Sequence, residues 1–267
     1  MDILSLLWGT VLLRPYVFVF LAVYLTIAIL NMGVLRSVIF TVIGYTVAFA
    51  SEYSSTRNGF PYGFYSYIET TRTQELWISN VPFMDSLSYS FLAYVSFTMS
   101  MLLWSPLRKN GWDIRLANSN SLQHSARVIF TGAALFMMLD VIIDPVAFLG
   151  DRWFLGKIYT YQEQGEYFNI PLTNFGGWFL VGTTILYLFS RVNRRLTAII
   201  PVKTADIPCQ ALLGPGLYFG VLAFNLSVTF WIGEIVMGLC GTMITGILLT
   251  LTVARIQRTG SVQFSVE

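Results

Sequence analysis

Long apolar stretches alternate with short polar connections along this chain. An apolar stretch of about 20 residues is long enough to cross the hydrocarbon core of a bilayer as an α-helix. The stretch 211–253 is too long for one such helix, and Gly233-Glu234 is its expected break. The pattern therefore predicts seven transmembrane helices, over residues 11–30, 34–50, 84–104, 126–149, 172–190 and two within 211–253.

The composition supports a membrane protein. Hydrophobic residues make up 55% of the 267 residues and charged residues only 11%, with a mean hydropathy of +0.64. A soluble domain carries about 25% charged residues, which keep its surface in water. We therefore expect an all-α polytopic bundle in which residues 1–267 form a single integral membrane domain. The first apolar stretch has no basic start and no small-residue cleavage site, so we expect it to be retained as a helix.

Lysine and arginine residues set the predicted orientation. With seven helices, only five of the sixteen basic residues fall on one side, so that side is expected to be outside and the other cytoplasmic. The N-terminus is then outside and the C-terminus cytoplasmic, whereas six helices would scatter the basic residues over both sides. The outer five are Arg14, Arg57, Arg72, Arg152 and Lys157.

Acidic residues gather on the opposite side from most of the basic ones. All of the fourteen except Asp113, Asp206 and Glu267 fall toward the outer side. Carboxylates contribute little to topology, so the positive-inside rule does not explain this gathering. We therefore expect a working site at the outer face.

Asp140 and Asp144 are the strongest candidates for that site. They lie four residues apart at the end of the fourth helix, which puts both on one helix face. A charged group inside a membrane helix is costly unless it is paired or faces a polar cavity. Two carboxylates this close repel each other, so one keeps a proton, as general acid catalysis requires. The alternative is a structural pair that binds a neighbouring helix end or Arg152.

Other polar residues stand at predicted helix ends. Glu52 ends the second helix and has no simple structural role, which makes it a second candidate. Asp85 and Asn174 begin the third and fifth helices, where each is either a helix cap or part of the site. Glu234 is either the polar tip of a tight turn or a site carboxylate.

The order of these residues indicates an internal repeat. An acid at a helix end, an aromatic and glycine-containing loop, and a proline followed three places later by a polar residue occur twice in the same order. Two hairpins of the same orientation would place their loops side by side on the outer face. The two predicted units are residues 34–104 and 126–190.

The sequence also excludes several activities. His124 is the only histidine, too few for a di-iron centre or a bis-histidine haem. Cys209 and Cys240 lack metal-site spacing, and no nucleotide-binding, serine-hydrolase or zinc-protease motif is present. The net charge of +2 gives no reason to expect a nucleic-acid partner. We therefore expect no metal and no cofactor.

Four segments stand out between residues 52 and 178, about half of the chain. They are Glu52 with residues 59–67, Val81-Pro82 with Asp85, residues 140–145, and residues 170–178. In this order they resemble the carotenoid biosynthesis membrane family that includes the CruF-type carotenoid hydratases. The last two predicted helices resemble the family only in hydropathy.

This resemblance implies the cofactor-free addition of water across the terminal double bond of an acyclic carotenoid end, giving a tertiary alcohol. Asp140 or Asp144 would donate the proton, and Glu52 or Asp85 would activate water. The carotenoid would come from the bilayer of a prokaryotic plasma membrane, and electron-rich rings would flank the cation. The substrate-binding candidates are Tyr62, Tyr65, Tyr67, Asn174, Trp178 and Glu234.

Two other functions fit the same residues. Carboxylates inside a membrane also serve as proton relays, so a proton-coupled transporter of a lipid or small solute is one alternative. Acids at one face favour a site open to one side over such a relay. The other alternative is a non-catalytic carotenoid-binding scaffold, which would not need the Asp140/Asp144 pair.

Overall fold

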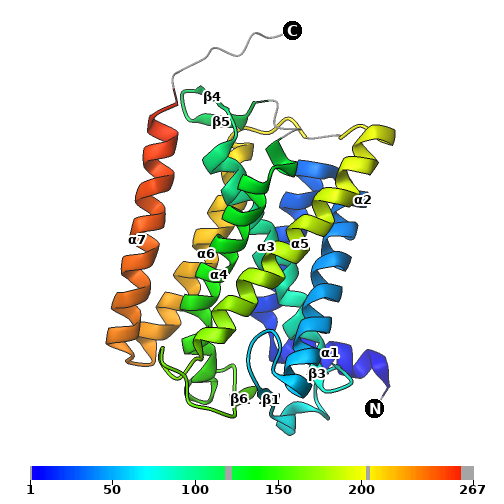
Figure 1. The fold of residues 1–267 in the computed structure, drawn as a ribbon, viewed down its shortest axis with the longest axis vertical. Coiled ribbons are helices and arrows are strands. Elements are labelled where there is room, and N and C mark those ends of the chain that lie inside the picture. Colours follow the sequence, from blue (N-terminus) through cyan, green and yellow to red (C-terminus); the bar gives the residue numbers. More distant parts are fainter. Residues whose placement is uncertain (1, 118–121, 203–204, 260–267) are drawn as a thin grey trace.

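The computed structural model of the chain describes residues 2–117, 122–202 and 205–259. This part is a bundle of helices with a few short strands, which confirms the predicted all-α polytopic fold (Figure 1). Lys203 and Glu267, which contribute to the charge pattern, lie outside the described residues. The helices are α1 (Ile3–Leu13), α2 (Pro15–Asn58), α3 (Phe83–Trp104), α4 (Ala126–Phe148), α5 (Leu172–Ile199), α6 (Gln210–Trp231) and α7 (Ile235–Gln257).

Helix α2 crosses the bundle twice. Its 44 residues would extend about 66 Å as one straight helix, roughly twice the hydrocarbon thickness of a bilayer. The chain reverses at Gly33, whose φ of 80° is left-handed and favours glycine. The two halves then pack together, with the Tyr24 hydroxyl 2.8 Å from Thr41 Oγ1. Together with the other five long apolar helices among the described residues, this gives the seven predicted crossings.

Helix α1 is separate from the first crossing. The prediction started that crossing at residue 11, whereas α1 ends at Leu13 and α2 begins at Pro15 (Figure 1). Proline suits the first turn of a helix because its missing N–H needs no partner there. Large apolar side chains of α1 are exposed, as expected of a helix lying at a membrane interface. They are Ile3, Leu4, Trp8 and Leu12.

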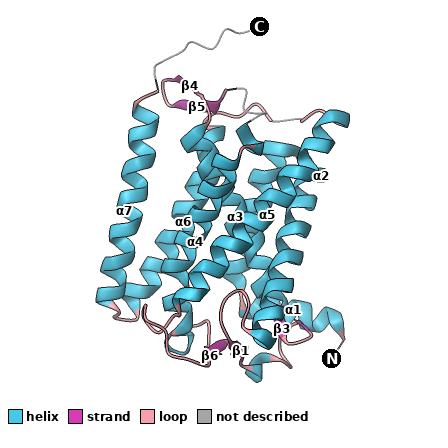
Figure 2. Cartoon of the chain, in the orientation of Figure 1, coloured by secondary structure: helices cyan, strands magenta, loops and turns pink. Residues whose placement is uncertain are grey.

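The short strands lie in the connections at the two ends of the bundle (Figure 2). At the end near α1, β1 (Tyr65–Tyr67) pairs antiparallel with β6 (Tyr159–Tyr161). Beside them β2 (Trp77–Ile78) pairs with β3 (Val81–Pro82). At the other end, β4 (Leu107–Asn110) pairs with β5 (Asp113–Leu116). The β1–β6 pair joins two connections that are almost 100 residues apart, with Tyr65 opposite Tyr161.

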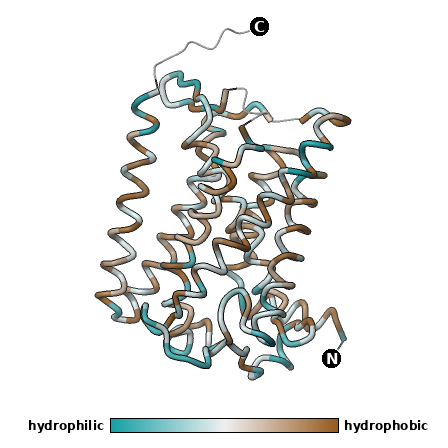
Figure 3. The backbone as a smooth tube through the Cα atoms, in the orientation of Figure 1, coloured by the Kyte–Doolittle hydropathy of each residue, from teal (hydrophilic) through white to brown (hydrophobic). Residues whose placement is uncertain are grey.

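Hydropathy divides the molecule into two polar ends and an apolar middle (Figure 3). The end that carries most of the lysines and arginines is called the basic end here, and the opposite one the acidic end. The reversal at Gly33, the β4–β5 hairpin and the last turns of α5 and α7 lie together at the basic end (Figure 1). Helix α1 and the β1–β6 pair lie at the acidic end. The first and last described helices therefore end on opposite sides, as seven crossings require. That the basic end faces the cytoplasm stays a prediction.

Candidate active site

The first pair of carboxylates at the acidic end is Glu52, near the end of α2, and Asp85, in the first turn of α3. The Tyr67 hydroxyl lies between them, 3.1 Å from Glu52 Oε1 and 2.6 Å from Asp85 Oδ2. Ser86 Oγ donates a hydrogen bond to Glu52 Oε2. Because Tyr67 has a single hydrogen to donate, it satisfies only one of the two carboxylates at a time.

The second pair is Asp140 and Asp144 on α4, and it faces more donors. Asn174, in the first turn of α5, donates through Nδ2 to Asp140 Oδ2 at 2.7 Å and to Asp144 Oδ2 at 3.0 Å. Tyr161 donates to Asp144 Oδ2 at 3.0 Å, and Tyr159 donates to Asp144 Oδ1. Asp144 thus accepts hydrogen bonds from three side chains. Asp140 Oδ1 is buried and has no hydrogen-bond partner among the described residues.

The β1–β6 pair brings these tyrosines over the ends of the helices. Alternate residues of a strand point to the same face, so Tyr65 and Tyr67 share one face, as do Tyr159 and Tyr161. Burial, followed by the neighbouring Asp85 and Glu52, raises the pKa of Tyr67 well above its ordinary value. Burial and the neighbouring Asp144 do the same to the pKa of Tyr159. Both hydroxyls therefore stay protonated donors at neutral pH.

These side chains enclose a cavity of about 50 Å³. Three of the four carboxylates reach it, whereas Asp140 does not line it. Tyr89 and Trp178 form one wall, with their rings stacked 4.4 Å apart. None of the described carboxylates, histidines or cysteines forms a group of three suited to a metal ion. The lining residues are Glu52, Tyr62, Tyr65, Tyr67, Asp85, Tyr89, Asp144, Tyr159, Tyr161, Asn174 and Trp178.

A second, mostly apolar cavity of about 100 Å³ also reaches Asp85. It lies between the first half of α2 and helices α3, α4 and α6. In its lining the half-buried rings of Tyr16 and Phe224 stack at 5.3 Å, and Phe20 meets Phe224 edge-on at 5.6 Å. Asp85 therefore stands where an apolar cavity meets a polar one.

Most of the residues proposed from the sequence meet at this one place. Glu52, Asp85, Asp144 and Asn174 lie together with Tyr62, Tyr65, Tyr67 and Trp178. Glu234 lies elsewhere, in the turn between α6 and α7, where it forms an ion pair with Arg152. We therefore assign Glu234 to the turn, the first of the two roles considered for it, and give it no place in the site.

Sequence reasoning did not select four further residues of this site. Tyr159 and Tyr161 carry a usable signal, because Tyr-x-Tyr also occurs at residues 65–67 between the other two helices. Ser86 and Tyr89 carry none, since serine and tyrosine are unremarkable within an apolar helix.

Comparison with known proteins identifies the family. A family model described as "Carotenoid biosynthesis protein" matches residues 11–250, nearly the whole chain. The chain belongs to this family. No curated protein and no solved structure matches it. The match includes all the carboxylates of the site and six of the seven crossings in full, together with most of α7. This carotenoid biosynthesis protein is thus an integral membrane protein whose buried acids and aromatic residues meet at one end of the bundle.

Proposed function

We propose that this carotenoid biosynthesis protein adds water to the terminal double bond of an acyclic carotenoid end, giving a tertiary alcohol. The observation that carries the proposal is that Glu52 and Asp85 meet Asp144 at one small cavity lined with aromatic rings, with Asp140 joined to Asp144 through Asn174. Hydration of an alkene needs an acid, a base and a site that stabilises a cation. The residues of this cavity are of the types that supply each of these.

The hydrogen bonds favour Asp144 as the base. A carboxylate that accepts from Tyr159, Tyr161 and Asn174 is stabilised in its ionised form. Asp140 beside it shares the Asn174 amide, and repulsion between the two carboxylates is relieved when Asp140 holds a proton. This reverses the sequence hypothesis, which gave the proton donor to Asp140 or Asp144.

The Glu52/Asp85 pair is better suited to donate the proton. Among the described residues, only Ser86 and Tyr67 donate to these two carboxylates, so a proton on one of them completes the hydrogen bonds around Tyr67. Asp85 also borders the apolar cavity from which an alkene would arrive. We assign the transferred proton to this pair, with Asp85 facing the substrate.

The reaction then runs in two balanced steps. The acid of the Glu52/Asp85 pair gives its proton to the less substituted carbon of the double bond, and the cation forms at the tertiary carbon. Water adds its oxygen to that carbon and gives a proton to Asp144. Proton exchange through the tyrosine hydroxyls and solvent restores both groups. Trp178 and Tyr89 present electron-rich rings that stabilise the cation.

The substrate fits a route from the lipid. The apolar cavity is bounded by half-buried aromatic rings of α2 and α6, which are outer helices with exposed apolar side chains. An end group that passed Tyr16 and Phe224 would reach Asp85 directly. The cavity volumes suit an end group, so the remaining polyene would stay in the bilayer.

The test is expression in a bacterial host that makes lycopene, with the extracted pigments analysed by mass spectrometry. The expected product carries one added water at each modified end. Unchanged pigments from hosts offering lycopene and a one-end-cyclised carotenoid, with good membrane expression, would refute hydration. A transporter or scaffold would give the same unchanged pigments, so the product mass separates these functions.

A matched pair of variants ties the product to the site. Asp85→Asn should abolish hydration because it removes an acid that faces the substrate. Glu69→Gln removes an exposed carboxylate at the same end, paired with Arg72 and outside the cavity, and should leave hydration unchanged. Equal activity in both variants would contradict the role given to Asp85.

A further inference from the structure

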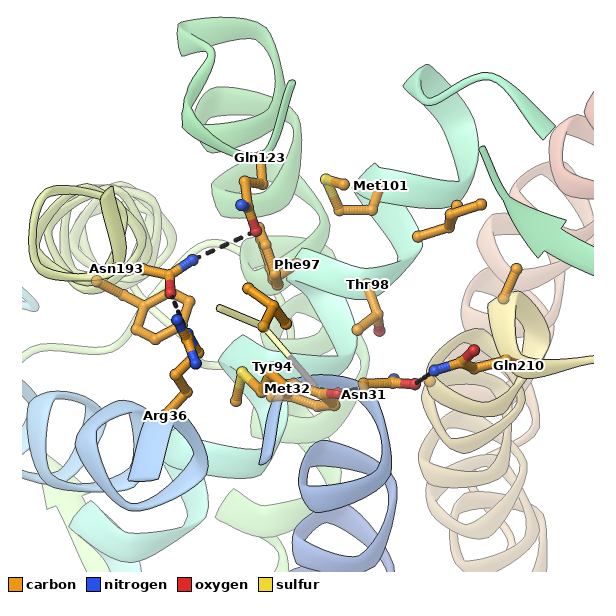
Figure 4. A pocket seen from close by; sticks show the side chains of 15 residues that line it. Asn31, Met32, Arg36, Tyr94, Phe97, Thr98, Met101, Gln123, Asn193 and Gln210 are labelled. Atoms are coloured by element: carbon orange, nitrogen blue, oxygen red, sulfur yellow. Dashed lines mark hydrogen bonds between the residues drawn. The ribbon is translucent and has the colours of Figure 1, made fainter. Parts of the chain in front are cut away.

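A further cavity lies at the basic end, far along the bundle from the carboxylates. It has a volume of about 200 Å³ and is formed by the reversal of α2 together with α3, α5 and α6. One part of its lining is apolar, with Met32, Phe97, Met101 and Phe189. The other part is polar, with one arginine and several carboxamides (Figure 4).

Arg36 is the charged residue of this lining. It is only 4% exposed, and it donates through Nε to Asn193 Oδ1 at 2.9 Å and through Nη2 to the Ile200 carbonyl at 2.6 Å. Both acceptors are neutral. Its other nitrogen, Nη1, makes no hydrogen bond to a described residue, and no described carboxylate pairs with it. A buried cation without a counterion is unfavourable, so this cavity attracts an anion.

Carboxamides hold the polar side of the cavity in place. Asn193 donates to Gln123 Oε1 at 3.3 Å while it accepts from Arg36, and Gln210 donates to Asn31 Oδ1 at 2.9 Å (Figure 4). The bonds of Asn193 hold the guanidinium of Arg36, a residue of the cavity lining, against α5. Rigid positioning of a donor in advance favours binding because less order is lost when the ligand arrives.

The surroundings add to the positive potential. Most of the basic residues of the chain lie at this end. The two described acids of this end, Asp113 and Asp206, both pair with Arg115 and so do not offset Arg36. An anion that approaches this end is therefore attracted by several exposed arginines before it reaches the cavity.

We propose that this cavity binds a phosphate group through Arg36, either of an anionic phospholipid or of free phosphate. The planar guanidinium matches phosphate oxygens better than a spherical anion, and the cavity is larger than a halide ion would fill. The apolar part of the cavity would contact the carbon atoms of the group to which the phosphate is bonded. If the basic end faces the cytoplasm, it also meets the leaflet surface that anionic lipids enrich. The site does not depend on the proposed hydration, because it shares no residue with the carboxylate cavity.

The first experiment measures thermal unfolding of the purified protein in neutral detergent, with sodium phosphate or sodium chloride at equal ionic strength. Phosphate is expected to raise Tm saturably by about 5 °C, because a ligand bound only to the folded state stabilises it. Chloride is expected to give no saturable rise.

Variants then locate the effect. Arg36→Gln should lose the phosphate response, and Arg36→Lys should weaken it about tenfold because the bidentate fork is lost. Ala211→Leu fills the cavity without touching Arg36 and should also lose the response, which covers the case that Arg36→Gln does not fold. Arg255→Gln is the matched control, since Arg255 caps carbonyls of Leu103 and Ser105 at the same end but does not line the cavity.

Native mass spectrometry with added phosphatidylglycerol or phosphatidylcholine distinguishes the two sources of phosphate. Retention of phosphatidylglycerol that Arg36→Gln abolishes identifies a lipid headgroup, and a response to inorganic phosphate alone identifies free phosphate. The proposal is overturned if neither is bound, or if Arg36→Gln and Ala211→Leu respond as the wild type does.

Discussion

Among the residues of the site, Asp144 accepts hydrogen bonds from three side chains, whereas Glu52 and Asp85 share the single hydroxyl hydrogen of Tyr67. Three side chains point hydrogens at Asp144, and an asparagine there would turn an amide group toward some of them. That arrangement leaves buried donors facing each other, which costs free energy, and it removes the base of the proposed hydration.

We therefore expect Asp144→Asn to lower hydration by about 10²- to 10⁴-fold, the usual contribution of a general base. Pigment conversion, normalised to the amount of protein in the membrane, measures the effect. Asp151→Asn, an exposed carboxylate after the same helix, serves as the control. Conversion at the wild-type rate in Asp144→Asn would remove Asp144 from the mechanism.

A second residue-scale prediction concerns stability. Arg14 and Glu75 form an ion pair of 3.2 Å, with side chains only 2% and 0% exposed. Removing one partner leaves the other charge buried and alone, so Arg14→Met should cost about 3–5 kcal/mol. Adding Glu75→Leu should recover much of this loss. Thermal unfolding in detergent measures both, and a double variant as unstable as Arg14→Met would show that the ion pair is not the cause.

The sequence could predict Glu52, Asp85, Asp144 and Asn174 because polar groups in membrane helices are costly and therefore conspicuous. It could not select Tyr89 or Ser86. Helix α3 is buried on nearly all sides, so no exposed apolar face shows which of its residues turn toward the site. The ion pair between Glu234 and Arg152 could not be predicted either, because hydropathy does not report the loop conformation that brings the two residues together.

At the scale of elements, helix α5 is held close to the loop that follows α2. A Cβ added to Gly177 would meet the Tyr62 ring at 2.5 Å and the Pro61 carbonyl oxygen at 2.8 Å. A Cβ added to the neighbouring Gly176 meets nothing within 4 Å. The two adjacent glycines thus offer a matched test of this contact.

We expect Gly177→Ala to push Tyr62 and the cavity wall apart, lowering both Tm and hydration. Gly176→Ala should keep full activity and stabilise α5 by up to about 1 kcal/mol, because alanine favours the helix. Unfolding temperature and pigment conversion are measured for both. Equal behaviour of the two variants would contradict the close packing of α5 against Tyr62.

The number of crossings was predictable because hydrophobic length is set by the bilayer. The short strands in the connections could not be predicted in this way. A three-residue strand carries almost no period, and the partner of Tyr65 is Tyr161, far away in sequence. The proposed repeat of residues 34–104 and 126–190 stays a prediction, although α3 and α5 both begin after a proline and carry Asp85 and Asn174 in their first turns.

At the scale of the whole molecule, the two ends differ in charge, and this difference predicts the orientation in the membrane. A green fluorescent protein fused after Arg258 should fluoresce in the cytoplasm, and alkaline phosphatase at the same place should be inactive. The same reporters fused after Asn80, in a loop predicted to lie outside, should give the opposite result. Active phosphatase after Arg258 would invert the predicted topology.

The pairing of β1 with β6 closes the carboxylate cavity on its loop side. The tyrosines that close the cavity are the same ones that bond to Glu52, Asp85 and Asp144. If these strands move away from the helix ends, the tyrosines no longer donate hydrogen bonds to the carboxylates, and the cavity opens to solvent at the same time. Under the proposed hydration, the acid is therefore in place only while the cavity is closed, and bulk water does not reach the cation that the acid generates.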